Sequence, residues 1–285
     1  MRWEGRRQST NIEDRRGRRM GRTIGIGGGV GTLVVVLLIM FLGGDPTPLL
    51  TGPQTTQVGP GGTEAPYQEG PAEAQMREFI SVVLADTEDT WRPLFAELGG
   101  SYEDPALVLF TDAVQSGCGA APSAAGPFYC PLDRKVYLDL SFFQELSQRF
   151  GAPGDFAQAY VVAHEVGHHV QTLLGISQQT MQLREDRPDL ANQVSVRQEL
   201  QADCFAGLWG HHANRSRQLL EAGDIEEGLS AAAAIGDDRM QRQAGGWVNP
   251  ESFTHGSSEQ RVRWFRRGLE TGRFDACDTF NTDAL

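Results

Sequence analysis

The chain has 285 residues, of which 40% are hydrophobic and 22% are charged. This composition is typical of a globular protein and excludes a fully disordered or fibrous chain. The formal net charge of −12 at pH 7 argues against nucleic acid as a partner. The start of the chain is nevertheless basic, because eight arginines and only three acidic residues precede residue 23.

An uncharged, apolar stretch follows the basic start, from Ile24 to Leu42. A helix of this length just crosses a hydrocarbon core of about 30 Å, and arginines collect on the cytoplasmic side of such spans. The pattern predicts a single-pass membrane anchor, with a basic cytoplasmic segment (1–22), a transmembrane helix (23–42) and an extracytoplasmic remainder. A cleaved signal peptide is the alternative, although no Ala-x-Ala site follows the stretch.

The remainder divides into a spacer and one domain. Residues 43–71 are rich in Pro, Gly and Thr, which is typical of an extended, flexible linker. Residues 72–285 are expected to form one α+β domain that begins with a helix, followed by a second short helix that Thr87 caps and that ends at Gly99. Short β-like runs predict a small sheet at 106–110, 128–130 and 135–140. Further helices are expected near 155–174, 195–212, 215–222, 225–243 and 257–270.

The helix expected at 155–174 carries His164, Glu165 and His168. Residues four apart lie on one helix face, so the two histidines can present their imidazole nitrogens to one metal ion. Glu165 lies beside them and can reach a water molecule on that ion. This His-Glu-x-x-His pattern predicts a metal site with its own base. The alternative is a polar face of a buried helix, but burying such groups without partners is costly. His169 points away from this face and is not expected to bind the metal.

A catalytic zinc ion takes three protein ligands and keeps one position open. On the helix expected at 195–212, with Ser195 and Gln198 as its capping box, Glu199 and Asp203 are four apart and share a face. Glu199 is the candidate third ligand, and Asp203 could accept the outer N–H of a ligating histidine. A solvated acidic stripe is the alternative interpretation. The competing third ligands are His211, His212 and His255.

Small residues are expected to bring these two helices close together. Ala163 and Gly167 form a stripe beside the histidines, and Gly207 continues the stripe of Glu199 and Asp203. Close approach of the two stripes would place the acidic residues next to the histidines. The sequence therefore predicts that the metal site lies between the two helices.

His255 lies just before a helix that Ser257 and Gln260 would cap. A histidine held on such a turn could donate a hydrogen bond to a developing oxyanion. A turn histidine without chemistry is the alternative. The arginines that follow are expected on a solvated face; they are Arg261, Arg263, Arg266 and Arg267.

The four cysteines favour disulfides if the domain is exported to an oxidising compartment. Four cysteines allow three pairings, and free buried thiols are the alternative. Because Cys118 and Cys130 bracket a short loop, we expect this pair, which leaves Cys204 for Cys277. The cysteines lack the short paired spacing of a zinc ribbon, so a cysteine-based metal site is not expected.

These segments together resemble the bacterial neutral zinc metallopeptidases. The resemblance rests on the opening MRWEGRRQSTNIEDRRG, the apolar stretch, and the motifs VVAHEVGHHVQ, RQELQADCFAGLW and THGSSEQRVRWF, in this order. It implies a zincin-like metallopeptidase domain that binds one zinc ion. The implied site residues are His164, His168 and Glu199 as ligands and Glu165 as the catalytic base. By analogy with glutamate-zincins, it also implies supporting roles for Asp203 and His255.

The expected function is zinc-dependent hydrolysis of peptide bonds in a peptide or protein substrate, at the outer face of the membrane. Zincins hold the substrate extended against an edge strand, and residues 135–140 are the candidate strand. Two alternatives remain open: a binding or scaffold protein that zinc only stabilises, and a zinc hydrolase of a non-peptide, cell-wall amide. Glu165 argues against the first, because a structural zinc site does not need a base.

Overall fold

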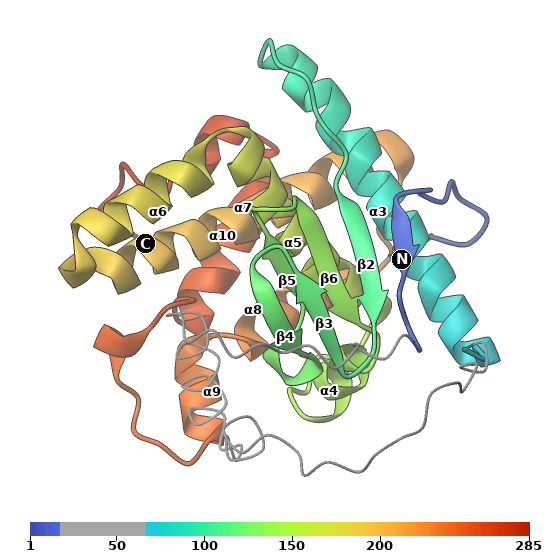
Figure 1. Ribbon diagram of the computed structural model, residues 1–285. Helices are drawn as coiled ribbons and strands as arrows, with labels where there is room; N and C mark the ends of the chain where they lie inside the picture. The colour runs from blue at the N-terminus through green and yellow to red at the C-terminus, as the bar shows by residue number, and fades with distance from the viewer. Residues whose placement is uncertain (18–66) are drawn as a thin grey trace.

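Four strands form a mixed sheet in the computed structural model, which describes residues 1–17 and 67–285 (Figure 1). The order is β1-β2-β6-β5, in which the β1–β2 and β2–β6 pairs are parallel and the β5–β6 pair is antiparallel. Strands β3 and β4 form a separate antiparallel hairpin. The bounds are β1 Ile12–Asp14, β2 Ala106–Phe110, β3 Ala113–Ser116, β4 Gly119–Pro122, β5 Phe128–Cys130 and β6 Lys135–Asp139.

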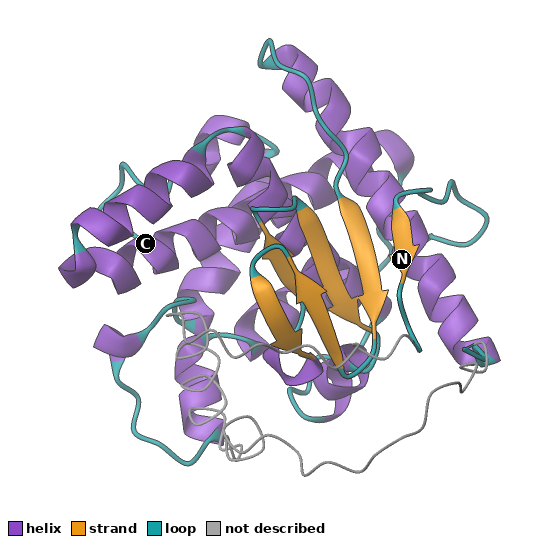
Figure 2. Cartoon of the chain, viewed as in Figure 1, coloured by secondary structure: helices purple, strands orange, loops and turns teal. Residues whose placement is uncertain are grey.

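Helices make up most of the remaining chain and lie behind and beside the strands (Figure 2). Among the described residues, α3 precedes the sheet's longer strands, and the other α-helices follow β6 in sequence. An α+β architecture with a mostly helical C-terminal part is thus confirmed. The bounds are α3 Pro71–Glu97, α4 Phe142–Gln148, α5 Asp155–Leu173, α6 Ile176–Asp186, α7 Ala191–Arg217, α8 Asp224–Ala234, α9 Asp237–Gln243 and α10 Ser258–Thr271.

The two faces of the sheet pack against different partners. Leu107 and Leu109 of β2 belong to the large core that the sheet shares with the helices. Val108 and Phe110 point to the opposite face, because side chains alternate along a strand, and they pack with Val114 of the β3–β4 hairpin. The sheet is therefore covered on both faces.

The first seventeen residues belong to the folded domain. Strand β1 pairs in parallel with residues 107–109 of β2, and the Met1 ammonium lies 2.7 Å from Asp155 at the start of α5. This differs from the expectation of a separate segment 1–22 and a domain that begins at residue 72. The predicted transmembrane helix (23–42) and most of the predicted linker lie outside the described residues. Within 1–17 and 67–285, no helix is long and apolar enough to span a membrane.

Several predicted helix ends differ from the structure. Thr87 does not cap a second helix, because α3 continues through it and its Oγ1 donates a hydrogen bond to the carbonyl of Leu84 at 2.7 Å. Helix α7 begins at Ala191, so Ser195 lies inside it and is no cap. The predicted helix 215–222 is absent, since α7 runs to residue 217. The predicted helix 225–243 is divided at Gly236 into α8 and α9.

The cap of α10 and both disulfides agree with the sequence predictions. Ser257 accepts a hydrogen bond from the Gln260 backbone N–H, and the Gln260 side chain accepts one from Ser257 N. Cys118 is bonded to Cys130, which ties the hairpin to β5, and the second disulfide, Cys204–Cys277, ties α7 to the C-terminal segment.

Glycines set the distance between the central helices. A Cβ atom added to Gly167 of α5 would lie 2.9 Å from the Ala202 carbonyl oxygen of α7, so the two backbones nearly touch. This contact was predicted. Gly207, predicted to face α5, instead faces α10, where a Cβ would lie 2.0 Å from the Phe265 carbonyl oxygen. Helix α7 is therefore in close contact with a helix on either side.

We expect Gly167→Ala to lower the free energy of unfolding. The added methyl meets backbone atoms of α7, and overpacking of this kind costs about 1–3 kcal/mol. This exceeds the gain of about 1 kcal/mol in helix propensity. Urea unfolding measures the difference, with Gly100→Ala as the control, since a Cβ there would lie 3.7 Å from its nearest neighbour. Equal stability of the two variants would contradict the close contact.

Candidate metal centre

Helices α5 and α7 bring together the three residues predicted to bind a metal. The Nε2 atom of His164 lies 3.2 Å from one carboxylate oxygen of Glu199, and that of His168 lies 3.4 Å from the other. One ligand atom from each of the three residues falls within 4.8 Å of the others. These residues therefore form a cluster that could hold a metal ion.

The spacing and chemistry of the cluster fit zinc. Bonds of about 2.0–2.1 Å in a tetrahedral site place neighbouring ligand atoms roughly 3.3 Å apart. The two distances from Glu199 to the histidines are close to this value. Two imidazoles and one carboxylate also match the ligands of a catalytic zinc site with one open position. The described residues thus satisfy the requirements of this ion.

Asp203 orients the first histidine. One turn after Glu199 on α7, its Oδ1 lies 2.8 Å from Nδ1 of His164 and also accepts a hydrogen bond from the Tyr160 hydroxyl. Because a carboxylate only accepts, Nδ1 of His164 must carry the proton, which leaves Nε2 to face Glu199. This is the contact predicted for Asp203.

Gln171 orients the second histidine, and the sequence did not predict it. Its Oε1 lies 2.9 Å from Nδ1 of His168, and its Nε2 donates to the Gln198 carbonyl at 2.7 Å and to Oε1 of Gln201 at 3.0 Å. The amide is fully buried. With its nitrogen donating twice to α7, its oxygen must accept from His168, so Nε2 of this imidazole also faces Glu199. A glutamine one turn after the second histidine was the only sequence signal.

Arg261 is buried at the site, although it was predicted on a solvated face. Its guanidinium donates two hydrogen bonds to Asp203, at 2.8 and 2.9 Å, and its residue exposure is 2%. The sequence contained a signal for this burial, because Arg261 shares the apolar face of α10 with Trp264, Phe265 and Gly268 at helical spacing. Asp203 thus has cationic partners on two sides.

These contacts shift the pKa values of the cluster. Burial disfavours the charged form of His164, but the charges of Asp203 and Glu199 outweigh it and raise its pKa to about 10. Burial likewise opposes ionisation of Glu199, yet the neighbouring histidines hold the pKa of its carboxyl well below the usual range. Together, these pKa shifts favour an ionised Glu199 carboxylate next to imidazoles that bind either a metal cation or a proton.

Glu165 differs from the other two carboxylates because it has no cationic side chain bonded to it. Only 8% of the residue is exposed, and burial raises its pKa. Among the residues that the structure describes, none donates a hydrogen bond to its carboxylate. It lines a cleft of about 450 Å³, together with the metal cluster, His255 and Tyr129. Its oxygens are thus free to bind a molecule in the cleft.

Asp237, at the first turn of α9, holds the His255 loop. Its carboxylate accepts hydrogen bonds from the backbone N–H groups of Thr254, His255 and Gly256 at 2.7–3.1 Å. It also accepts one from Nδ1 of His255 at 3.0 Å. Desolvation opposes protonation of His255, but the contact with Asp237 raises its pKa. Nε2 of His255 is left without a protein partner in the described chain, and the ring is 44% exposed in the cleft. The sequence did not predict Asp237.

The remaining histidines are not part of the cluster. His211 and His212 bond to the carbonyls of Leu269 and Gly272 near the far end of α7, so they are excluded as the third ligand. His169 is buried and bridges two segments, with Nδ1 3.0 Å from the Tyr129 hydroxyl and Nε2 2.6 Å from the Glu103 carbonyl. As predicted, it points away from the histidine pair, and its ring is engaged by these two hydrogen bonds.

The edge strand at the cleft is β5 and not the predicted one. Residues 135–140 contain β6, which lies between β2 and β5 and has no free edge. Strand β5 is at the end of the sheet, and its Phe128 and Tyr129 line the cleft. The strands at 128–130 and 135–140 were both predicted, but their order in the sheet depends on pairing with β2, which the local sequence pattern does not contain.

A helix-borne histidine pair completed by a carboxylate from a second helix, with a free glutamate beside it, is characteristic of mononuclear metallohydrolases. The chain belongs to the family described as "Putative neutral zinc metallopeptidase", which matches residues 1–280. It is 48% identical to "Uncharacterized protein YpfJ" of Escherichia coli (strain K12), over 98% of this chain and 99% of that protein. It is 41% identical to "Uncharacterized protein Rv2575" of Mycobacterium tuberculosis (strain ATCC 25618 / H37Rv), over 86% of each. No solved structure matches this chain.

We expect Gln171→Leu to weaken zinc binding by about 10- to 100-fold, because His168 loses the acceptor that fixes its tautomer and ring orientation. Competition with a chelator of known affinity measures the change. Gln178→Leu is the matched control, since Gln178 is exposed on α6. Equal zinc affinity of both variants would show that Gln171 does not orient the ligand.

Zinc affinity should rise with pH. Because the pKa of His164 is raised to about 10, a proton occupies this imidazole below that pH and must leave before a metal ion binds. Each displaced proton makes the affinity roughly tenfold stronger per pH unit. Titration calorimetry at pH 7.5 in two buffers of different ionisation enthalpy counts the protons. We expect at least one per zinc, and a count of zero would contradict the pKa shift.

Proposed function

We propose that the protein is a zinc-dependent peptidase of the zincin type, with His164, His168 and Glu199 as the metal ligands. The observation that supports this most strongly is the shared direction of the two histidines. Nδ1 of each is engaged by a buried acceptor, so that both Nε2 atoms face Glu199. Such an arrangement prepares a metal site before the metal arrives.

Glu165 acts as the general base in this proposal. A bound zinc ion supplies Lewis acidity, since it lowers the pKa of a coordinated water and polarises a carbonyl oxygen. Glu165 takes a proton from the attacking water and passes it to the leaving amine. The raised pKa of its carboxyl suits both steps, because a base works best when its pKa is near the working pH.

His255 stabilises the oxyanion in this proposal. Asp237 holds Nδ1, so the ring can donate from Nε2 into the cleft. The raised pKa keeps a proton available on that nitrogen over a wider pH range. Donors of this kind contribute about 3 kcal/mol to the stability of a transition state.

Strand β5 is the proposed binding strand for an extended peptide. Its outer edge borders the cleft that contains Glu165, and a peptide could pair with it through backbone hydrogen bonds. The contact between Tyr129 and His169 holds this strand against α5, and the Cys118–Cys130 disulfide joins it to the β3–β4 hairpin. A peptide bond held there would be positioned against the metal cluster.

The binding or scaffold alternative is less well supported. A structural zinc site is closed by four protein ligands. Here the cluster contains three ligands, opens into the cleft, and has Glu165 beside it without a bonded partner in the described chain. A structural role would explain none of these features.

We expect Glu165→Gln to retain zinc and to lose peptide hydrolysis by 10²- to 10⁴-fold, because the amide cannot accept the proton of water. The purified full chain, loaded with zinc, is assayed against a quenched peptide library and a cell-wall fragment library. Bound zinc is measured by elemental analysis.

Glu145→Gln is the matched control for this experiment. Glu145 also lines the cleft, but its side chain is 50% exposed and pairs with Arg149 on α4. It should keep full activity. If the parent cleaves only the cell-wall amides, the proposal of a peptidase is wrong. If it binds zinc and cleaves neither library, the result contradicts the peptidase proposal and favours the scaffold alternative.

A further inference from the structure

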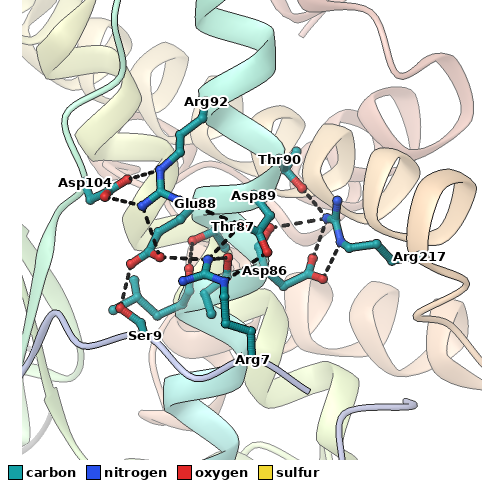
Figure 3. A network of polar contacts seen from close by, with 12 residues as sticks. Arg7, Ser9, Asp86, Thr87, Glu88, Asp89, Thr90, Arg92, Asp104 and Arg217 are labelled. Carbon is teal, nitrogen blue, oxygen red and sulfur yellow. Dashed lines mark hydrogen bonds and ion pairs between the residues drawn. The ribbon is translucent and has the colours of Figure 1, made fainter. Parts of the chain in front are cut away.

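Residues 1–17 complete a buried polar site on α3, which Figure 3 shows from close by. Glu88 is 1% exposed, and its carboxylate accepts hydrogen bonds from the Ser9 hydroxyl and, at 2.9 Å, from the Asn11 amide. Arg7 lies 2.9 Å from the same carboxylate and donates to the Ala85 carbonyl at 2.6 Å. Burial of a carboxylate with few partners is unfavourable, and apart from Arg92 of α3, at 3.6 Å, these partners of Glu88 come from the N-terminal segment.

Backbone and apolar contacts join the same two parts. The Leu107 N–H donates to the Asn11 carbonyl, and the Arg15 N–H donates to the Leu109 carbonyl, both at 2.8 Å. The ring of Trp3 packs edge-on against Phe79 of α3 with 5.4 Å between centroids. Strand β1 is therefore an integral strand of the sheet.

Residue 17, where the first described segment ends, and residue 67, where the second begins, lie next to each other. Arg16, whose side chain is 2% exposed, pairs with Asp14 and with Glu69 at 2.6 Å, and its guanidinium lies 5.0 Å from the Tyr67 ring centroid. A Cβ atom on Gly17 would lie 2.7 Å from Cβ of Tyr67. The two ends of the intervening segment are thus in direct contact.

We propose that residues 1–17 and residues 67–285 lie on the same side of the membrane. Paired strands are about 4.8 Å apart, whereas a hydrocarbon core is about 30 Å thick. If the chain crossed the membrane once between Gly17 and Tyr67, β1 and β2 would be on opposite sides. Exchange of β1 between two copies would not restore the pairing, because both copies would have their β1 strands on the same wrong side. Because β1 is paired with β2, Gly17 and Tyr67 are expected on one side of the membrane.

This arrangement differs from the one expected from the sequence, in which 1–22 is cytoplasmic and the domain is outside. That expectation took the early arginines as a topology signal. Several of them instead have partners in the domain: Arg6 donates to the Arg217 carbonyl at 2.8 Å, and Arg7 and Arg16 form the contacts described above. The disulfides favour the oxidising side for both parts. The proposal does not depend on hydrolytic activity.

Cysteine labelling of the full chain tests the proposal. The four native cysteines are paired, so a single added cysteine is the only free thiol. Thr10→Cys reports on the N-terminal segment and Leu132→Cys on the domain; Thr10 is exposed and Leu132 is 70% exposed. Spheroplasts that express each variant are treated with a membrane-impermeant maleimide, before and after permeabilisation, with a cytoplasmic thiol protein as the control for sealing.

We expect both positions to react before permeabilisation, and to the same extent. Reaction of both only afterwards would also support a common side, although a cytoplasmic one. Reaction of one position before and of the other only after permeabilisation would overturn the proposal. A second pair of exposed positions, Glu4→Cys and Gln178→Cys, repeats the comparison if either first variant folds poorly.

Discussion

The carboxylate of Asp203 joins the candidate metal centre to the helical core. It is fully buried and bonds to His164 and Tyr160 of α5 and to Arg261 of α10, while its own backbone belongs to α7. Removing one partner from such a buried ion pair typically costs 3–5 kcal/mol, because the remaining charge is left without compensation. The orientation of His164 and the packing of three helices therefore both depend on the Asp203 carboxylate, so that a change in one affects the other.

The same carboxylate determines the charge balance of the site. Glu165, Glu199 and Asp203 bring three negative charges when ionised, and Arg261 brings one positive charge, with both imidazoles neutral. A divalent cation would balance the excess, and protons on the imidazoles are the competing solution. The pKa of His164 is raised, against desolvation, by its contacts with Asp203 and Glu199, and the pKa of Glu199 is lowered, also against desolvation, by the two histidines. Of these three carboxyl groups, Glu165, which lacks a bonded cation, is the one whose pKa is raised by burial.

Helical periodicity explains which parts of the site could be predicted. His164 and His168, like Glu199 and Asp203, are four residues apart, so each pair shares a face regardless of the tertiary fold. The close contact between α5 and α7 could also be predicted, because Gly167 is a small residue beside the histidines. Gln171 and Asp237 were missed because their roles depend on contacts with other elements. The N-terminal strand was missed because the arginines on either side of it, such as Arg7 and Arg16, resemble a topology signal, although their partners are in the folded domain.

The two edges of the sheet have different environments, and this difference connects the N-terminal strand to the cleft. Strand β1 covers the edge of β2, and Ser9 and Asn11, which precede the strand, bond to buried Glu88 of α3, so this edge is built into the domain. At the opposite edge, β5 borders the cleft and is held by a disulfide and by His169 of α5. Since Glu165 is on the same helix as His169, the free edge and the base keep a fixed separation. An extended peptide paired with β5 would therefore meet Glu165 at a constant distance, whatever its side chains.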